Sequence, residues 1–302
     1  MARSILITGG TGFIGQKLCH SLNHNDFQLT VLSRQSPENV KTLCGRVEPI
    51  ASLEALRDHP GFDAIINLAG EGIADRRWSE HRKQQLRDSR IALTRQLVEL
   101  ADTWGSPPKV MVSGSAVGFY GDQGQQAVTE ETAPHDEFTH QLCRDWETEA
   151  RRFEPLGTRV CLSRTGVVVG PAGGFLQRML PPFRFGLGGR LGAGTQYMPW
   201  VHRNDVVNAL LWMMNTESAS GAYNVVSPSP VSNQDFTRSL GRVLHRPTIL
   251  PAPAAALKLA LGEMSRLLLT GQNARPARLL DAGFKFEYPE LEPALRDAIR
   301  SC

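Results

Sequence analysis

The sequence predicts an α/β fold: a Rossmann-type, doubly wound parallel sheet with a smaller, mostly helical C-terminal domain. Two observations predict it. Short β-branched runs alternate with helical patterns through the first half of the chain, and a glycine-rich loop joins the first run to the first helix. The 302 residues suffice for one large core or two modest ones. We expect residues 1–165 and 197–227 to form the main domain and residues 166–196 and 228–302 the small one.

The expected strands are apolar almost throughout, as parallel strands buried on both faces should be. They cover residues 4–8, 28–33, 63–67, 109–113 and 159–169. The expected helices between them cover residues 13–23, 53–59, 79–103 and 137–153. Proline and glycine then predict loops from Gly170 to Gly194. A helix at 204–214 and a strand at 223–226 return to the main sheet, and proline-separated helices follow from residue 232.

The composition excludes several classes of protein. A hydrophobic share of 41% rules out a disordered chain. Apolar stretches stay well short of the roughly 20 residues of a membrane span, so no span or secretory signal is expected. A net charge of +3 is too small to indicate a nucleic-acid partner. The odd number of cysteines and the lack of a C-x-x-C pair predict reduced thiols and a cytoplasmic location. These cysteines are Cys19, Cys44, Cys143, Cys161 and Cys302.

Residues 71–95 carry seven lysines or arginines against four acidic residues. Two interpretations stay open for this basic segment. It is either a solvated helix covered with ion pairs or a basic wall beside an anionic ligand.

The glycine-rich loop, residues 8–15, reads TGGTGFIG and opens the first expected helix. It satisfies both G-x-G-x-x-G and G-x-x-G-x-x-G. Glycine lets the backbone turn tightly and approach a pyrophosphate, which binds the free N–H groups of a helix N-terminus. The loop therefore predicts a dinucleotide site. The residues expected to hold the pyrophosphate are Gly9, Thr11, Gly12, Phe13 and Ile14.

The end of the second expected strand selects the dinucleotide. An acidic residue there would hold the ribose 2′-hydroxyl of NAD, whereas this chain has Ser33 and Arg34. Because a guanidinium beside a hydroxyl suits a 2′-phosphate, NADP is favoured over NAD. The alternative for Arg34 is an ordinary surface arginine. Leu68 and Ala69, after the third long strand, are expected along the middle of the cofactor, although a plain strand-to-loop transition would also explain them.

These motifs, together with SGSAVGFYG at residues 113–121, resemble the extended (atypical) short-chain dehydrogenase/reductase superfamily over nearly the whole chain. The phrases at residues 67–71, 181–189, 200–202 and 282–284 are similar, more narrowly, to YfcH-type epimerase-family proteins. The resemblance implies an NADP-dependent oxidoreductase or epimerase that transfers a hydride on a sugar-nucleotide-like or other small hydroxyl or carbonyl substrate.

The superfamily's catalytic set is a Ser or Thr with Y-x-x-x-K, and no Y-x-x-x-K occurs in this sequence. Aligned by its Trp-Glu pair, the helix at 137–153 places Thr139 and Cys143 at the Tyr and Lys positions. Ser115 matches the catalytic hydroxyl. Tyr120 and His140 are the candidate proton carriers, with core packing and a solvated helix position as their respective alternatives.

The resemblance also places further residues beside the cofactor. Ser113 ends a strand, and Gln85 and Val168 lie near the dinucleotide. Arg90 would hold the nicotinamide ribose or a substrate anion, but it cannot act as a base because arginine keeps its proton.

The expected partner is a small molecule, either neutral or anionic, in a pocket with aromatic walls and one cationic anchor. The segment that lines the cleft in relatives supplies Phe183, Arg184, Met198 and Trp200 here, although core packing would explain these residues equally well. A homodimer through the helices at 79–103 and 137–153 follows by analogy. The alternative function is a non-catalytic NADP(H)-binding redox sensor or division-related scaffold, which the missing Tyr and Lys motivate.

Overall fold

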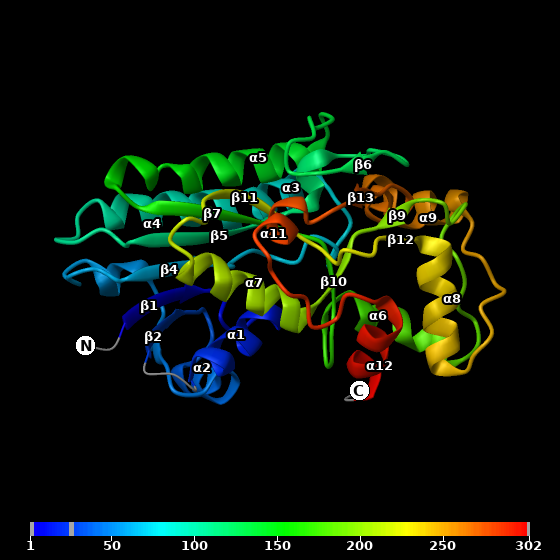
Figure 1. Cartoon of the computed structure of the whole chain (residues 1–302), viewed down its shortest axis with the longest axis horizontal. Helices are drawn as coiled ribbons and strands as arrows, with labels where there is room; N and C mark the ends of the chain where they lie inside the picture. The colour runs from blue at the N-terminus through cyan, green and yellow to red at the C-terminus, as the bar shows by residue number, and fades with distance from the viewer. Residues whose placement is uncertain (1–2, 24–26, 301–302) are drawn as a thin grey trace.

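The computed structural model describes residues 3–23 and 27–300, and its centre is a seven-stranded sheet (Figure 1). The strands are β1 (Arg3–Thr8), β2 (Phe27–Leu32), β3 (Glu48–Ile50), β4 (Ala64–Asn67), β5 (Val110–Ala116), β7 (Arg159–Thr165) and β11 (Gly221–Val225). All pairs are parallel, in the order β11-β7-β5-β4-β1-β2-β3. The chain winds outward in both directions from β1, so a topological switch point lies between β1 and β4. The predicted doubly wound sheet is confirmed.

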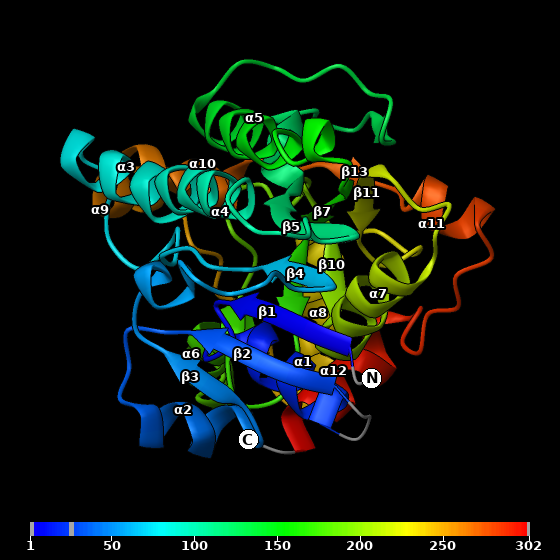
Figure 2. The ribbon, with the colours of Figure 1, turned by 90° about the vertical axis from the view of Figure 1, so that its left-hand side faces the viewer.

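Helices cover both faces of this sheet (Figure 2). One face carries α1 (Phe13–Asn23), α2 (Pro37–Cys44) and α7 (Arg203–Asn215); the other carries α3 (Glu80–Arg87), α4 (Leu93–Ala101) and α5 (Phe138–Arg151). Successive side chains of a strand point to opposite faces. Ile5 and Ile7 accordingly belong to the core under α1 and α7, whereas Leu6 belongs to the core under α4 and α5.

The small domain lies beyond the carboxyl ends of the sheet strands (Figure 1). It contains β8 (Val167–Val169), α6 (Gly174–Arg184), β9 (Tyr197–Met198), β10 (Trp200–His202), β12 (Val231–Ser232), α8 (Asn233–Leu244), α9 (Ala254–Leu261), α10 (Arg266–Leu269) and α12 (Leu291–Arg300). Its own core joins Leu176, Trp200, Phe236 and Leu295. The mostly helical character matches the prediction.

Part of the C-terminal segment returns to the main sheet. Strand β13 (Asn273–Ala274) pairs with β6 (Ala127–Val128), and α11 (Ala277–Asp281) packs on β11. The guanidinium of Arg278 donates to the carbonyl of Ala222 at 2.6 Å, and Leu279 is buried in the core under α1. The predicted domain boundaries remain a prediction.

Gly166 divides the predicted strand at 159–169 in two. Its N–H donates to Val225 of the main sheet at 3.1 Å, while the next N–H, of Val167, donates to Pro199 at 2.7 Å. A Cβ on Gly166 would overlap the carbonyl oxygen of Pro199. The first part, β7, therefore stays in the main sheet, and β8 pairs with β10 in the small domain.

The helix expected at 79–103 is present as α3 and α4, which a π-helical turn, Asp88–Ala92, joins. Two sequence predictions about local structure were wrong. Residues 53–59 form only a short 3₁₀ turn, Leu53–Leu56. Residues 174–184 form α6, not a loop, and the helix contains Pro181 and Pro182. Leu176, Leu180 and Phe183 bury one helical face in the small core. That burial outweighs the two missing N–H groups, which fall near the end of the helix.

The four cysteines in the described residues, Cys19, Cys44, Cys143 and Cys161, are free, as predicted; Cys302 lies outside them. Among residues 3–23 and 27–300, no helix has the length and apolar character needed to cross a bilayer.

Candidate functional site

The glycine-rich loop packs backbone against backbone at the switch point. Gly9 has a φ of +71°, and a Cβ there would lie 2.7 Å from the backbone of Leu68. A Cβ on Gly15 would overlap the carbonyl oxygen of Gly9. The Thr8 hydroxyl donates to Asn67 at 2.6 Å and accepts from the N–H of Ala69 at 3.1 Å, which ties the loop to the end of β4. Only glycine fits at positions 9 and 15 of this cradle of backbone, and α1 begins within the loop, at Phe13.

The next part of the site lies at the end of β2. The guanidinium of Arg34 is 3.6 Å from the carboxylate of Glu71, and the Arg34 side chain is 89% exposed. Arg82 binds the same carboxylate, and this hydrogen bond lowers the pKa of Glu71. Arg82 also donates to Gln85 at 3.2 Å. The hydroxyl of Ser33 lies 3.4 Å from that of Thr11 in the glycine loop. Two arginines thus cover one carboxylate here, and Arg34 is held only loosely.

Arg90 lies in the π-helical turn beside the end of β4. Its guanidinium donates to the carbonyls of Glu71 at 2.8 Å and Leu86 at 3.2 Å, and it lies 5.5 Å from the ring of Trp146. Burial lowers the pKa of Arg90. A Cβ on Gly70 would lie 2.8 Å from the guanidinium carbon, so this arrangement depends on that glycine.

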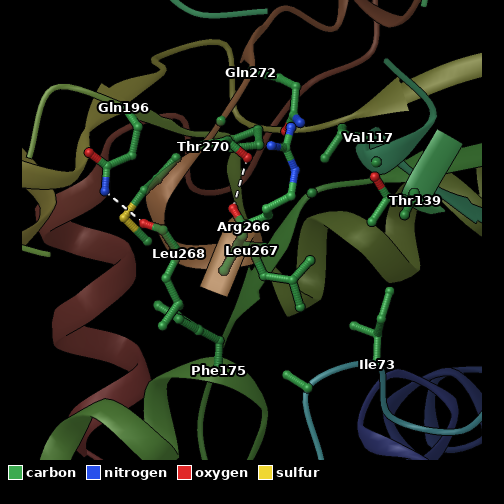
Figure 3. Close-up of a pocket in the computed structure, with 18 of the residues that line it drawn as sticks. Ile73, Val117, Thr139, Phe175, Gln196, Arg266, Leu267, Leu268, Thr270 and Gln272 are labelled. Carbon is green, nitrogen blue, oxygen red and sulfur yellow. Dashed lines mark hydrogen bonds between the residues drawn. The ribbon is translucent and has the colours of Figure 1, made fainter. Parts of the chain in front are cut away.

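A cavity of about 560 Å³ opens at the ends of β5 and β7, beneath the small domain (Figure 3). Its lining includes Val117 after β5, Thr139 and Cys143 on α5, and Val168 on β8. The cavity shares a wall with the glycine loop. Its lining residue Gly174 packs so closely on Phe13 of the loop that a Cβ on Gly174 would lie 2.7 Å from the phenyl ring. Ser113 lies on β5, where it is buried and is not among the described residues that line the cavity.

The three predicted catalytic residues point into the protein. Within the described part of the chain, none of them is among the residues that line the cavity. The Ser115 hydroxyl donates to Glu147 at 2.7 Å, and His140 Nδ1 lies 2.6 Å from the carbonyl oxygen of Phe119. Tyr120 is fully buried and donates to Asn224 at 2.7 Å.

Burial raises the pKa of Tyr120 to about 12. A phenol of this acidity does not exchange its proton readily near neutral pH. This geometry does not favour Tyr120 as a proton carrier. His140 binds the backbone through Nδ1 alone and is not among the described residues that line the cavity, so its role as a proton carrier stays a prediction.

A buried ion pair joins β7 and α5 beside the cavity. The sequence analysis did not single out either of its residues. Arg164 on β7 binds both carboxylate oxygens of Glu147 on α5, each at 2.9 Å. The same guanidinium donates to the Tyr120 hydroxyl at 3.0 Å. The available signal was an arginine in the middle of the strand predicted at 159–169, since a charged side chain is rarely buried without a partner.

The basic segment at 71–95 is largely neutralised by ion pairs. Among its members, Arg82 pairs with Glu71, Lys83 with Glu263, Arg87 with Asp145 and Arg95 with Glu149. These contacts favour the ion-pair interpretation over a basic wall.

Comparison with known proteins agrees with this geometry. A family model described as the NAD dependent epimerase/dehydratase family matches residues 5–226, and a domain of unknown function (DUF1731) matches residues 252–298. An epimerase family protein of Mycobacterium bovis is 41% identical over 98% of this chain and 97% of its own length. One from Staphylococcus aureus is 37% identical over 99% of both chains.

Solved structures share the fold. The human epimerase family protein SDR39U1 (isoform 2), crystallised with NADPH, is 32% identical with a TM-score of 0.89, over 99% of this chain and 100% of that one. UDP-glucuronic acid 4-epimerase from Bacillus cereus, in complex with UDP-glucuronic acid and NAD, is 18% identical with a TM-score of 0.79, over 99% and 98% of the two chains. The latter likeness concerns the fold alone. Because the family model matches residues 5–226 and a 41% identical relative is matched over 98% of the chain, this chain belongs to the NAD dependent epimerase/dehydratase family.

Proposed function

We propose that the protein is an NADP(H)-dependent oxidoreductase or epimerase that acts by hydride transfer on a small hydroxyl or carbonyl compound. One observation carries this proposal: the cavity shares a wall with the glycine-rich loop. Phe13 of the loop packs against Gly174, and Val168 lines the cavity beside them. A dinucleotide that begins on the loop would therefore end at the cavity.

The residues present fit such a cofactor. The loop is a cradle of backbone that a Cβ on Gly9 or Gly15 would fill, at the N-terminus of an 11-residue helix. The loosely held guanidinium of Arg34 suits a 2′-phosphate, and the NADPH in the human relative supports NADP over NAD. The proposed cofactor contacts are Gly9, Thr11, Gly12, Phe13, Ile14, Ser33, Arg34, Leu68, Ala69, Gln85, Arg90, Ser113 and Val168.

A bound NADPH would supply a hydride to a carbonyl carbon, so that the C=O double bond becomes a C–H and an O–H bond, NADP is formed and water provides the proton. Thr139 lines the cavity and donates its O–H to Glu137 at 3.0 Å, so its oxygen is left to accept from the hydroxyl of the substrate or product alcohol. A threonine hydroxyl is too weak an acid to serve as the proton source. Burial raises the pKa of Cys143 to about 11, so this neighbouring group stays a thiol.

The cofactor part of the proposal is tested by titrating the purified protein with NADPH and NADH. NADPH should bind more tightly, and Arg34→Ala should weaken NADPH about tenfold or more, a loss of at least about 1.4 kcal/mol, without changing NADH. Arg57→Ala, another exposed arginine, is the matched control. Equal affinities for the two dinucleotides would contradict the choice of NADP.

The catalytic part is tested by adding fractionated metabolite extract to the NADPH-loaded protein. We expect one fraction to oxidise NADPH, its consumed compound to be identifiable by mass, and Thr139→Val to slow the reaction. Ser115→Ala tests the serine of the sequence prediction, which would have to leave Glu147 to reach a substrate.

A second function is favoured by one observation, namely that Ser115, Tyr120 and His140 are all bonded within the protein. A non-catalytic NADP(H)-binding sensor would bind NADPH but would not oxidise it, whichever fraction of the extract is added. The cytoplasmic location and the homodimer remain predictions.

A further inference from the structure

We propose that the cavity takes a neutral, mostly apolar hydroxyl or carbonyl compound, and not a sugar carried on a nucleoside diphosphate. This inference rests on the proposed function and names its substrate class. Three features of the lining carry it: a group of apolar side chains, cations that are already neutralised, and several hydrogen-bond donors that are already used.

Five of the side chains labelled around the open space are apolar (Figure 3). Val117 and Phe175 come from opposite sides, from the end of β5 and from α6. Leu267 and Leu268 on α10 and Ile73 in the loop after β4 complete the enclosure. An apolar ligand would bury its surface against all of them, which is favourable because that surface leaves water.

The charges in the lining compensate one another. Two arginines face three carboxylates, and each arginine pairs with a carboxylate from another segment. Arg178 on α6 binds Asp75, and Arg266 on α10 binds Glu137, its Nε lying 2.9 Å from the carboxylate. The third carboxylate, Glu263, pairs with Lys83 at 2.7 Å. A diphosphate entering here would meet no surplus of positive charge among the described lining residues.

Several polar side chains in the lining direct their donors to protein oxygens. Gln196 donates to the carbonyls of Leu191 at 3.0 Å and Leu268 at 2.7 Å, and Thr270 donates to that of Arg266 at 2.8 Å. A phosphate needs donors, because it offers only acceptors, and its desolvation without them is costly. A hydroxyl group asks for a single contact, and it can donate to the oxygen of Thr139, whose own O–H is given to Glu137.

The cationic anchor expected from the sequence is not at the cavity. Among the described lining residues, Met198 is present but Phe183, Arg184 and Trp200 are not. Phe183 and Trp200 are buried in the small core, and Arg184 is exposed at the end of α6. Because Arg184 lies outside the cavity, the expectation of an anionic substrate loses the residue that would have bound the anion.

The test compares two probes on the NADPH-loaded protein by calorimetric titration and by the shift in melting temperature. The neutral probe is the bicyclic ketone 2-tetralone, and the anionic probe is UDP-glucose. We expect 2-tetralone to bind at least tenfold more tightly than UDP-glucose and to raise the melting temperature. Tighter binding of UDP-glucose, or no binding of 2-tetralone, would overturn the proposal.

Two variants change the charge of the cavity. Leu267→Arg adds a cation, and Glu137→Gln removes the charge that neutralises Arg266. Both should strengthen UDP-glucose binding at least tenfold, and Leu267→Arg should weaken 2-tetralone by a similar factor. Leu259→Arg, at an 82% exposed position on α9, is the control and should change neither. Unchanged UDP-glucose affinity in both variants would contradict the role assigned to the paired charges.

These outcomes separate the inference from the proposed function. The binding of NADPH alone, measured first, tests the cofactor site. The preference between the two probes is a binding measurement that needs no turnover, and it can be repeated without NADPH. Loss of NADPH binding would remove the proposed function, whereas reversed probe preference with normal NADPH binding would remove only the substrate class.

Discussion

The glycine-rich loop and the cavity lie next to each other, yet they are built from different parts of the chain. The loop is eight consecutive residues whose backbone forms the surface, so its shape depends on the absence of side chains. The cavity is lined by side chains from residue 72 to residue 272, held in place by packing and ion pairs. The first site is therefore encoded locally, and the second depends on the assembly of two domains.

The largest expected effect comes from the buried support of the cavity. Glu147→Ala leaves the Arg164 charge buried without its carboxylate and should lower the free energy of unfolding by about 3–5 kcal/mol. Urea unfolding measures this loss. If the two sites are independent, the protein that remains folded should bind NADPH normally.

Two further variants sharpen this result. Arg151→Ala, which removes an exposed ion pair on the same helix, should cost less than about 1 kcal/mol. The double variant Glu147→Ala/Arg164→Met should regain part of the lost stability, since the unpaired charge is gone. A double variant less stable than Glu147→Ala would show that the unpaired Arg164 charge is not the cause of the lost stability.

The second-largest expected effect comes from a substitution in the glycine-rich loop. Gly15→Ala places a methyl group on the carbonyl oxygen of Gly9, and the shift this forces should cost about 1–3 kcal/mol of stability. We also expect NADPH affinity to fall about tenfold or more, measured by fluorescence titration. Gly105→Ala, where a Cβ would meet nothing within 4 Å, is the control. Normal NADPH binding by Gly15→Ala would mean that the pyrophosphate lies elsewhere.

The smallest effect concerns His202, where β10 ends and α7 begins. His202 caps α7 by accepting from the N–H of Asn204, and its Nε2 lies 3.1 Å from the carboxylate of Asp297 on α12. Burial lowers the pKa of His202, although Asp297 and Glu287 oppose the shift and Arg203 adds to it. The unfolded chain then binds this proton more readily, so stability should fall as pH drops below about 6.5.

Urea midpoints at pH 7.5, 6.5 and 5.5 measure the His202 contribution, well above the range in which Asp and Glu titrate. His202→Ser keeps a capping oxygen and removes the imidazole, so its stability should change less over this interval. An identical pH dependence in both proteins would assign the effect to other groups.

The two sites also differ in how far they could be predicted from the sequence. The pattern of β1, loop and α1 is contiguous, and α1 begins and ends at the predicted residues. Cys143 and Thr139 were placed by alignment within one helix, and both line the cavity. Tyr120 was chosen for its chemistry, but its burial depends on Asn224 and Arg164, which lie far away in the sequence. The pairing of Arg266 with Glu137 likewise exists only after α10 folds over α5.

The shared strand at Gly166 has a mechanical consequence. Because adjacent N–H groups at 166 and 167 bond to different sheets, no slack chain separates the two domains at this crossing. The two sheets are therefore fixed to each other at this crossing. Because Thr165, Gly166 and Val167 also line the cavity, the crossing holds one wall of the cavity at a set position relative to the ends of the main-sheet strands.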